Sequence, residues 1–456
     1  MSVKVGIEAI SFYIPQLYLP IRELALARNI EPEKLEIGLG LNKMALNDCN
    51  EDTATLAANV LLKLIQDFNV NPTEIAKITL GTESALDGSK PTAIYATHMV
   101  EEVLKEKYGK RVFCNTDITD TVFACVGGID AMFNSIDYVS ANPTKKAIVI
   151  SADYAKYKLA SSGEYTQGSG AVAMLISANP KLISFDKNVG VATESVFDFF
   201  KPKQSIKLSD ELKNTIGTKN QKIEILLDEP VFEGQYSNEC YKKRIREAYQ
   251  HLKTQKQTNH KLFEDWRYII FHLPYAKQGQ RIFSDIFGNE NANWVSEITG
   301  KKDWEELDAN DLKAIAASEE YKAVVKQKIT PTQTASSEVG NIYTASIFLA
   351  FLSALENSLV NNEELTGQKI GFLSYGSGSK SKCFEGIVLP QWKEIIKKQF
   401  LFETLNKRKA ISFSEYETLH TKCLNAPLDD SSKKFVLDKI ESEVDELKGA
   451  RYYLYK

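Results

Sequence analysis

Cys125 has the sequence surroundings of a nucleophilic thiol. It lies between Phe123-Ala124 and Val126-Gly127-Gly128, and the segment that follows carries apolar residues at helical spacing, at 129, 132, 133, 136 and 139. A thiol at the start of a helix faces the unpaired N–H groups of the first turn, which favours the thiolate. Free cysteines are, however, more often small buried apolar side chains. Cys125 alone therefore indicates either a nucleophile or a core residue.

Three further polar residues stand where functional groups collect in proteins of alternating helices and strands. His272 ends an apolar run at 268–271, Glu83 follows a strand-like run at 78–82, and Asn341 precedes an apolar helix. Each also has an ordinary structural explanation, namely a hydrogen-bonded core histidine, a solvated carboxylate and a helix N-cap. None of the three is decisive by itself. We assign no role to the other histidines, which are His98, His251, His260 and His420.

Composition places the chain among ordinary globular proteins. Its 456 residues are 43% hydrophobic and 25% charged, with a net charge of -4, so nothing indicates a nucleic-acid partner. The length predicts two domain-sized halves. The six scattered cysteines lack the spacing of a zinc site and the density of a disulfide scaffold, which favours the cytoplasm. We recognise no signal peptide and no run long enough to span a bilayer, and we expect no membrane partner.

Helix-like and strand-like runs alternate along the chain, which predicts an α/β protein. In both halves an apolar strand, a Gly-Ser-Gly turn and a second strand follow one another, at 146–176 and 369–389, which suggests an internal duplication. Residues 180–265 are rich in charge and weakly periodic apart from a helix at 240–252, so we interpret them as an insertion. The segment after Leu389 is expected to form a helical appendage that folds back.

The second Gly-Ser-Gly turn is not a nucleotide-binding loop. The sequence 376–381, Gly-Ser-Gly-Ser-Lys-Ser, lacks the spacing of a phosphate-binding motif. No cluster of His, Cys and carboxylate residues has metal-ligand spacing either, so we expect no metal. Both glycine turns instead suit a close approach of the backbone, where N–H groups can face a carbonyl oxygen.

Ordered blocks across nearly the whole chain resemble the 3-hydroxy-3-methylglutaryl-CoA synthase family of the thiolase superfamily. The blocks lie at 36–40, 43–44, 81–84, 124–125, 151–153, 166–174, 197–202, 271–277, 339–344 and 374–378. Within them Cys125, Glu83, His272 and Asn341 fall on the family's catalytic positions. The resemblance therefore favours the functional interpretation of all four residues over the structural one.

The resemblance implies a condensation of acetyl-CoA with acetoacetyl-CoA and water to give 3-hydroxy-3-methylglutaryl-CoA in the mevalonate pathway. Cys125 would carry the acetyl group, Glu83 would be the general base, and His272 with Asn341 would polarise the acetoacetyl thioester. The N–H groups of Cys125 and Ser377 would stabilise the acetyl oxyanion. Contacts to the CoA thioester or its phosphates fall on Ser162, Thr166, Ser237, Lys277 and Arg281, the last standing where the family usually has lysine.

The fold that the resemblance implies is the five-layered αβαβα thiolase arrangement, built from two duplicated halves with a mid-chain insertion and a C-terminal appendage. We expect residues 1–178 to form the half that carries Glu83 and Cys125. Residues 179–390 would form the half that carries His272 and Asn341, and residues 391–456 would pack on that second half. A cytoplasmic homodimer is implied as well, without any cofactor, because the CoA thioesters are substrates.

Three other functions stay open on the sequence. A polyketide β-branching relative would use the same residues on a ketide held by an acyl carrier protein, although Lys277 and Arg281 favour CoA because its phosphates need cations. A cysteine hydrolase would use Cys125 and His272 and would not need Glu83. A catalytically silent scaffold of the same fold would take up no acetyl group.

Overall fold

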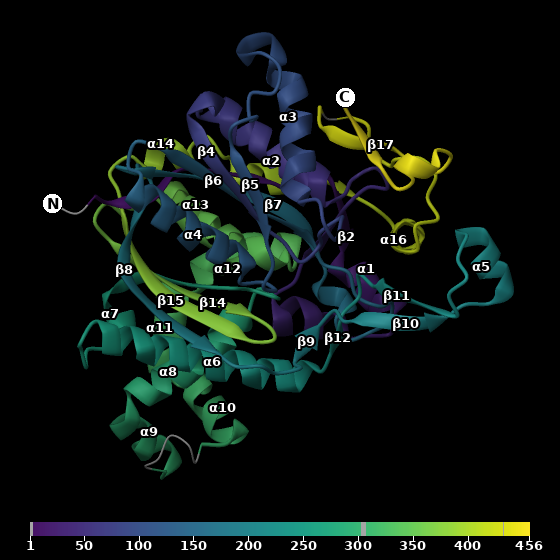
Figure 1. The fold of residues 1–456 in the computed structure, drawn as a ribbon. Helices are drawn as coiled ribbons and strands as arrows, with labels where there is room; N and C mark the ends of the chain where they lie inside the picture. Colours follow the sequence, from purple (N-terminus) through teal and green to yellow (C-terminus); the bar gives the residue numbers. More distant parts are fainter. Residues whose placement is uncertain (1–2, 302–306, 432) are drawn as a thin grey trace.

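Nine hydrogen-bonded strands form two connected sheets at the centre of the protein (Figure 1). The computed structural model describes residues 3–301, 307–431 and 433–456. In spatial order the first sheet is β1-β7-β6-β4-β5 and the second is β8-β15-β14-β13. The bounds of these strands are Val5–Tyr13 (β1), Ser169–Ala178 (β7), Lys146–Tyr154 (β6), Ile75–Gly81 (β4), Asp117–Thr121 (β5), Ile183–Thr193 (β8), Lys380–Val388 (β15), Lys369–Gly376 (β14) and Trp266–Phe271 (β13).

The two sheets repeat one topology. In the first sheet β1 pairs antiparallel with β7, β7 antiparallel with β6, and β6 parallel with β4. In the second sheet β8 pairs antiparallel with β15, β15 antiparallel with β14, and β14 parallel with β13. This correspondence confirms the predicted duplication. The sheets join where β1 meets β8, and a Cβ atom on Gly6 would lie 2.1 Å from the Ile183 carbonyl oxygen, so the junction requires glycine.

Helices complete the five predicted layers. Helices α2 and α3 cover the outer face of the first sheet, α6 covers that of the second, and α4, α12 and α13 lie between the sheets (Figure 1). Phe133 of α4 meets Phe384 of β15 with ring centroids 4.9 Å apart, which ties the middle layer to the second sheet. The strands β6 and β7 are buried along almost their whole length because helices cover both of their faces. The helix bounds are Thr53–Asp67 (α2), Thr92–Tyr108 (α3), Gly234–Gln255 (α6), Gly127–Ala141 (α4), Thr330–Val339 (α12) and Ser346–Val360 (α13).

The middle layer contains an unusually apolar helical segment. Tyr343–Val360, which comprises α13 and the turn before it, is long and apolar enough to cross a membrane by length and composition, yet 83% of this window is buried inside the protein. We expected no run of this kind, and that expectation was wrong. The apolar composition follows from the position of the helix, because a helix between two sheets is covered on all sides.

The mid-chain insertion is shorter than we expected. Residues 180–265 include β8, which belongs to the second sheet, and α6, which covers that sheet. The sequence does not predict β8 because the strand is half-buried along much of its length, so polar side chains are tolerated.

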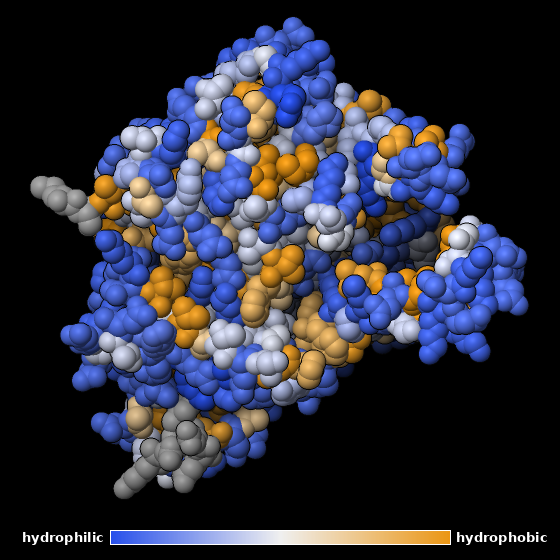
Figure 2. All heavy atoms as spheres, viewed as in Figure 1, coloured by the Kyte–Doolittle hydropathy of each residue, from blue (hydrophilic) through white to orange (hydrophobic). Residues whose placement is uncertain are grey.

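The part of the insertion that leaves the layered body is an arm at residues 199–232. It projects from the body and carries hydrophobic residues along its surface (Figures 1 and 2). Its elements are Phe199–Phe200 (β9), Lys203–Lys207 (β10), Asp210–Ile216 (α5), Lys222–Leu226 (β11) and Val231–Phe232 (β12). The strands pair within the arm, β10 with β11 and β9 with β12.

We predicted that the C-terminal appendage packs on the C-terminal half alone. In the structure it packs on both halves. Helices α14 and α15 contact α12 and α13, but the hairpin of β17 and β18 packs on α2 and α3 of the first half. The side chain of Asn59 on α2 explains this position, because it bonds to both the N–H and the carbonyl group of Phe435 in β17. The appendage is also less helical than expected, with bounds Trp392–Ile396 (α14), Leu401–Asn406 (α15), Lys409–Ala410 (β16), Phe413–His420 (α16), Phe435–Ile440 (β17) and Arg451–Tyr455 (β18).

Shorter elements fill the periphery of the layers. The strand β16 extends a small sheet with β2 and β3 beside the first sheet. The remaining bounds are Leu17–Pro20 (β2), Ile21–Ala27 (α1), Lys43–Leu46 (β3), Leu262–Asp265 (α7), Gln278–Glu290 (α8), Ala292–Thr299 (α9), Ala309–Ala317 (α10) and Glu319–Lys328 (α11), with helical turns at Lys34–Leu39, Pro72–Glu74, Glu164–Thr166, Tyr343–Ala345 and Asp445–Leu447.

Asp52 connects the C-terminal hairpin to α2, and its removal is expected to destabilise the protein. Its carboxylate caps α2 by accepting from the Thr55 N–H, and it also accepts from Arg451 at 3.1 Å and from the Tyr453 hydroxyl at 2.9 Å. Asp52→Ala should lower the free energy of unfolding by about 3 kcal/mol, since a cap is lost and two partners are left without an acceptor. Asp67→Ala, at the other end of α2, should cost no more than about 0.5 kcal/mol. Equal losses in urea denaturation would contradict this role.

Candidate active site

A cavity of about 620 Å³, lined by residues from both halves of the chain, contains most of the predicted site. Polar and aromatic side chains share its wall, as in many small-molecule sites. Of the ten predicted residues, the eight that line it are Cys125, Ser162, Thr166, Ser237, His272, Arg281, Asn341 and Ser377. The two others, Glu83 and Lys277, are not among its lining residues.

Glu83 nevertheless touches the thiol. The Sγ atom of Cys125 donates a hydrogen bond of 2.8 Å to Glu83 Oε1. Glu83 follows β4 and Cys125 precedes α4, so the end of a strand and the start of a helix bring them together. Ala124 has a φ of 41°, a left-handed conformation that is strained for alanine and marks the sharp turn into the helix. A thiol beside a carboxylate is the arrangement of a nucleophile and a base.

Asp153, which we did not predict as a site residue, holds the loop of Glu83. This buried carboxylate accepts from the Glu83 N–H at 2.7 Å and from the hydroxyl groups of Thr82 and Ser84, both at 2.9 Å. It also accepts from Thr344, which lies at the start of the middle-layer segment. A signal was present in the sequence, since Asp153 follows the apolar run at 146–151 as Glu83 follows the run at 78–82.

Burial controls the protonation of both reactive groups. Loss of hydration raises the pKa of Glu83 to about 7, with Lys201 opposing the rise and Asp153 adding to it. Burial also raises the pKa of the Cys125 thiol well above its usual value, and the neighbouring Glu83 carboxylate raises it further. The predicted preference for a thiolate is therefore wrong for the unliganded protein. The start of a helix is outweighed by burial and by an adjacent negative charge.

His272 is a neutral imidazole at the cavity wall. It follows the last residue of β13, is 2% exposed, and burial lowers its pKa to about 3. Its Nδ1 atom has no hydrogen-bond partner among the residues that the structure describes. A buried polar atom without a partner is costly, and an oxygen atom of a bound substrate would satisfy it. Tyr241 donates to the His272 carbonyl oxygen at 2.5 Å and so fixes the backbone at this point.

Asn341 both shapes the backbone and faces the cavity. Its Oδ1 atom accepts from the Tyr343 N–H at 2.9 Å and from the Ser346 hydroxyl at 3.1 Å, which is the capping role that its position suggests. Its own N–H donates to the Thr166 carbonyl oxygen at 2.8 Å. With Oδ1 engaged, the amide NH₂ group is the part of Asn341 that remains to donate to a ligand.

The turn that contains Ser377 lies against the loop of Cys125. A Cβ atom on Gly376 would lie 2.8 Å from the backbone nitrogen of Val126, so only glycine permits this approach. The buried carboxylate of Asp198 anchors the turn by accepting from the Gly378 N–H at 2.7 Å and from the Tyr375 hydroxyl at 2.6 Å. We did not predict this role for Asp198, although the residue belongs to the block at 197–202.

The predicted CoA contacts lie at different depths. Thr166 is buried and donates to the Gly163 carbonyl oxygen, Ser237 is half-buried, and Ser162 is exposed. The two cations bond to the backbone of the 34–39 turn, where Lys277 donates to Ile37 at 2.7 Å and Arg281 to Gly38 at 3.0 Å. Neither forms an ion pair with a carboxylate of a described residue, so both positive charges remain available to an anionic ligand.

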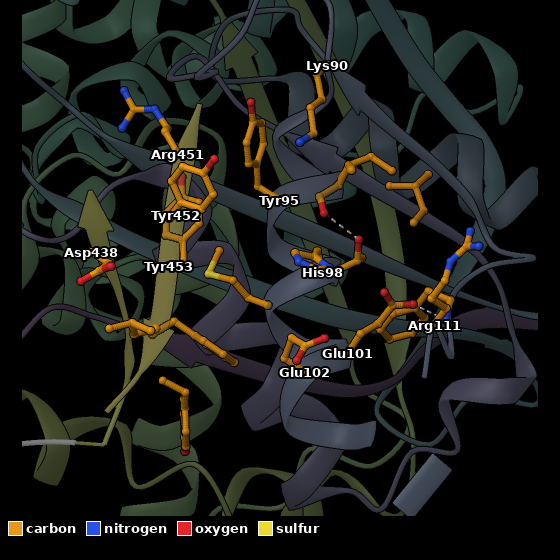
Figure 3. Close-up of a pocket in the computed structure, with 18 of the residues that line it drawn as sticks. Lys90, Tyr95, His98, Glu101, Glu102, Arg111, Asp438, Arg451, Tyr452 and Tyr453 are labelled. Carbon is orange, nitrogen blue, oxygen red and sulfur yellow. Dashed lines mark hydrogen bonds between the residues drawn. The ribbon is translucent and has the colours of Figure 1, made fainter. Parts of the chain in front are cut away.

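A second cavity, of about 650 Å³, contains none of the predicted residues. It lies between α3 and the β17–β18 hairpin, where Tyr95, His98 and Tyr452 contribute to its wall (Figure 3). Within residues 3–301, 307–431 and 433–456, no group of three or more His, Cys, Asp and Glu residues could hold a metal ion.

The sequence matches two family models that together cover most of the chain. The model described as hydroxymethylglutaryl-coenzyme A synthase N terminal matches residues 1–181, and the one described as hydroxymethylglutaryl-coenzyme A synthase C terminal matches residues 221–456. The hydroxymethylglutaryl-CoA synthase of Enterococcus faecalis is 28% identical over 94% of both chains, and that of Haloferax volcanii is 29% identical over 91% of both.

Solved structures give the same result. The structure of MvaS in complex with 3-hydroxy-3-methylglutaryl coenzyme A superposes with a TM-score of 0.81 at 29% identity over the whole of both chains. The HMG synthase of the curacin biosynthetic pathway has a TM-score of 0.76 at 22% identity over 99% of this chain and 100% of that one, a likeness that shows the fold alone. With the matching models and the shared thiolase-like fold, the chain belongs to the hydroxymethylglutaryl-coenzyme A synthase family.

Proposed function

We propose that the protein condenses acetyl-CoA with acetoacetyl-CoA and water to give 3-hydroxy-3-methylglutaryl-CoA and CoA. The observation that carries this proposal is the 2.8 Å contact between Cys125 and Glu83, next to a cavity that also contains His272 and Asn341. A thiol, a base of pKa about 7 and a neutral imidazole are the groups that acyl transfer followed by a carbon–carbon condensation requires.

Acetylation is the first step. The sulfur of Cys125 attacks the thioester carbon of acetyl-CoA, the bond from that carbon to the CoA sulfur breaks, and the departing CoA thiolate takes up the thiol proton. The backbone N–H groups of Cys125 and Ser377 would donate to the oxyanion, a role that the contact between their two loops supports.

Condensation and hydrolysis follow. Ionised Glu83 removes a proton from the acetyl methyl group, and the resulting carbanion equivalent attacks the ketone carbon of acetoacetyl-CoA. The ketone oxygen becomes the hydroxyl group of the product by taking up the proton that Glu83 removed, which restores the carboxylate. His272 and the amide NH₂ group of Asn341 hold and polarise the acetoacetyl thioester. Water then cleaves the thioester to Cys125, which releases the carboxylic acid product and restores the thiol.

The pH dependence of condensation is expected to follow Glu83. A general base must be ionised, so the rate should rise through pH 7, where the pKa of Glu83 lies, and fall about tenfold for each unit below it. His272 should add no limb near neutral pH because its pKa is about 3. The rate is measured in a single turnover on protein already acetylated at Cys125, so that the thiol does not contribute. A profile that is flat, or that falls as pH rises through 7, would contradict this assignment.

Several further features belong to the proposal. No cofactor is needed, because the CoA thioesters are themselves the substrates, and the scattered cysteines suit a cytoplasmic enzyme of the mevalonate pathway.

A homodimer is supported by the edge strand β5, whose outer backbone groups offer a pairing surface. Analytical ultracentrifugation should give twice the mass of one chain, and the mass of one chain at micromolar concentration would count against the dimer.

The substrate is tested by a steady-state assay of acetyl-CoA and acetoacetyl-CoA, repeated with the same acyl groups on an acyl carrier protein. Lys277 and Arg281, which both bond to the 34–39 turn, favour the CoA thioesters, since a nucleotide carries phosphates that two cations can bind. Preference for the carrier-protein thioesters would overturn the choice of CoA. Release of free acetate without condensation would indicate a cysteine hydrolase.

A further inference from the structure

Lys201 contacts the backbone of Glu83 and is not part of the mechanism described above. It follows β9, at the base of the arm, and is half-buried. Its Nζ atom donates to the backbone carbonyl oxygen of Glu83 at 3.2 Å and lies 4.8 Å from the centroid of the Tyr343 ring. A hydrogen bond and a cation–π contact therefore fix the ammonium group beside the base.

Lys201 differs in charge from the other groups around Glu83. The groups that face Glu83 are Cys125 from the turn into α4, Asp153 from β6, the hydroxyl groups of Tyr157 and Tyr343, and Lys201. In the described part of the chain, Lys201 is the one cation in this set, and its Nζ atom donates to a backbone carbonyl oxygen rather than pairing with a described carboxylate. Its charge is therefore directed at the reactive pair rather than neutralised by a neighbour.

We propose that Lys201 positions Glu83 and keeps its carboxyl group ionised for the condensation step. The inference rests on the proposed function, in which Glu83 is the base. Two carboxylates, Glu83 and Asp153, lie in a buried site that disfavours negative charge, and a nearby ammonium group is what offsets this cost. The same charge also opposes the rise in the pKa of the Cys125 thiol, so Lys201 supports both reactive groups.

Three substitutions separate charge from hydrogen bonding. Lys201→Met removes both, Lys201→Gln can still donate to the Glu83 carbonyl oxygen but has no charge, and Lys201→Arg retains the charge. The matched control is Lys203→Met, an exposed lysine two positions along the chain whose side chain contacts none of the described residues of the site. The measurement is the pH profile of condensation in a single turnover on acetylated protein, with acetylation of Cys125 followed separately by intact mass.

Both uncharged variants should shift the midpoint of the profile upward by about one pH unit, so that the rate below the midpoint falls about tenfold and recovers at high pH. Lys201→Arg and Lys203→Met should keep the wild-type midpoint. A midpoint that is unchanged in both Met and Gln variants would overturn the inference, as would an equal loss of rate at every pH. If Lys201→Met fails to fold, the Gln variant decides alone.

Failure of the inference can be told from failure of the proposed function. Wild-type protein that does not take up acetyl or does not condense refutes the function, whatever Lys201 does. Wild-type protein that condenses normally while the midpoint stays fixed in the uncharged variants refutes only the role of Lys201.

Discussion

Glu83→Ala is expected to accept an acetyl group on Cys125 and then fail to condense it. The substitution removes a carboxylate that raises the pKa of the thiol, so acetylation continues. Condensation loses its general base and should slow by at least about 10³-fold, within the range that a positioned base contributes. Acetyl-enzyme should therefore accumulate in the presence of both substrates, which intact-mass measurement detects.

Glu74→Ala is the matched control, since Glu74 is an exposed carboxylate at the other end of the same strand. It should acetylate and condense at the wild-type rate. Two results for Glu83→Ala would count against the account, either full turnover or a protein that takes up no acetyl group. The first would show that another residue is the base, and the second that Glu83 is needed to form the thioester.

Cys125→Ser is expected to abolish both acetylation and turnover, with a loss of roughly 10⁴-fold or more, the scale seen when a nucleophile is removed. A hydroxyl group of much higher pKa replaces a thiol that is already difficult to ionise in this buried position. Cys114→Ser changes an exposed cysteine outside the cavity that contains Cys125 and should retain normal acetylation. Acetyl uptake by Cys125→Ser at the wild-type rate would place the nucleophile elsewhere.

The candidate reactive groups could be picked out from the sequence because each follows a strand or precedes a helix, and the family resemblance then favoured a functional interpretation of them over a structural one. Such positions are visible in hydrophobic periodicity, and parallel topology gathers them at one edge of a sheet. The duplication was also visible, since the same strand-turn-strand pattern occurs twice and the two sheets have the same strand order. The five layers follow from that duplication once both sheets are covered by helices.

What the sequence did not reveal depended on burial and on long-range contacts. The protonation of Cys125 was predicted incorrectly, because the start of a helix is a local feature whereas loss of hydration is not. The role of Asp153 depends on Thr344, which lies far away in the chain. The place of the C-terminal hairpin depends on Asn59, an ordinary polar residue on a helix until Phe435 bonds to it. The strand β8 was overlooked because a half-buried strand tolerates polar residues.

The most direct test of the central claim follows one labelled acetyl group through the protein. Protein is treated with isotopically labelled acetyl-CoA, separated from free CoA thioesters, measured by intact mass, and then mixed with unlabelled acetoacetyl-CoA. The account predicts one labelled acetyl group on Cys125, its disappearance after mixing, and its recovery in 3-hydroxy-3-methylglutaryl-CoA. No label on Cys125, or label released only as acetate, would contradict it.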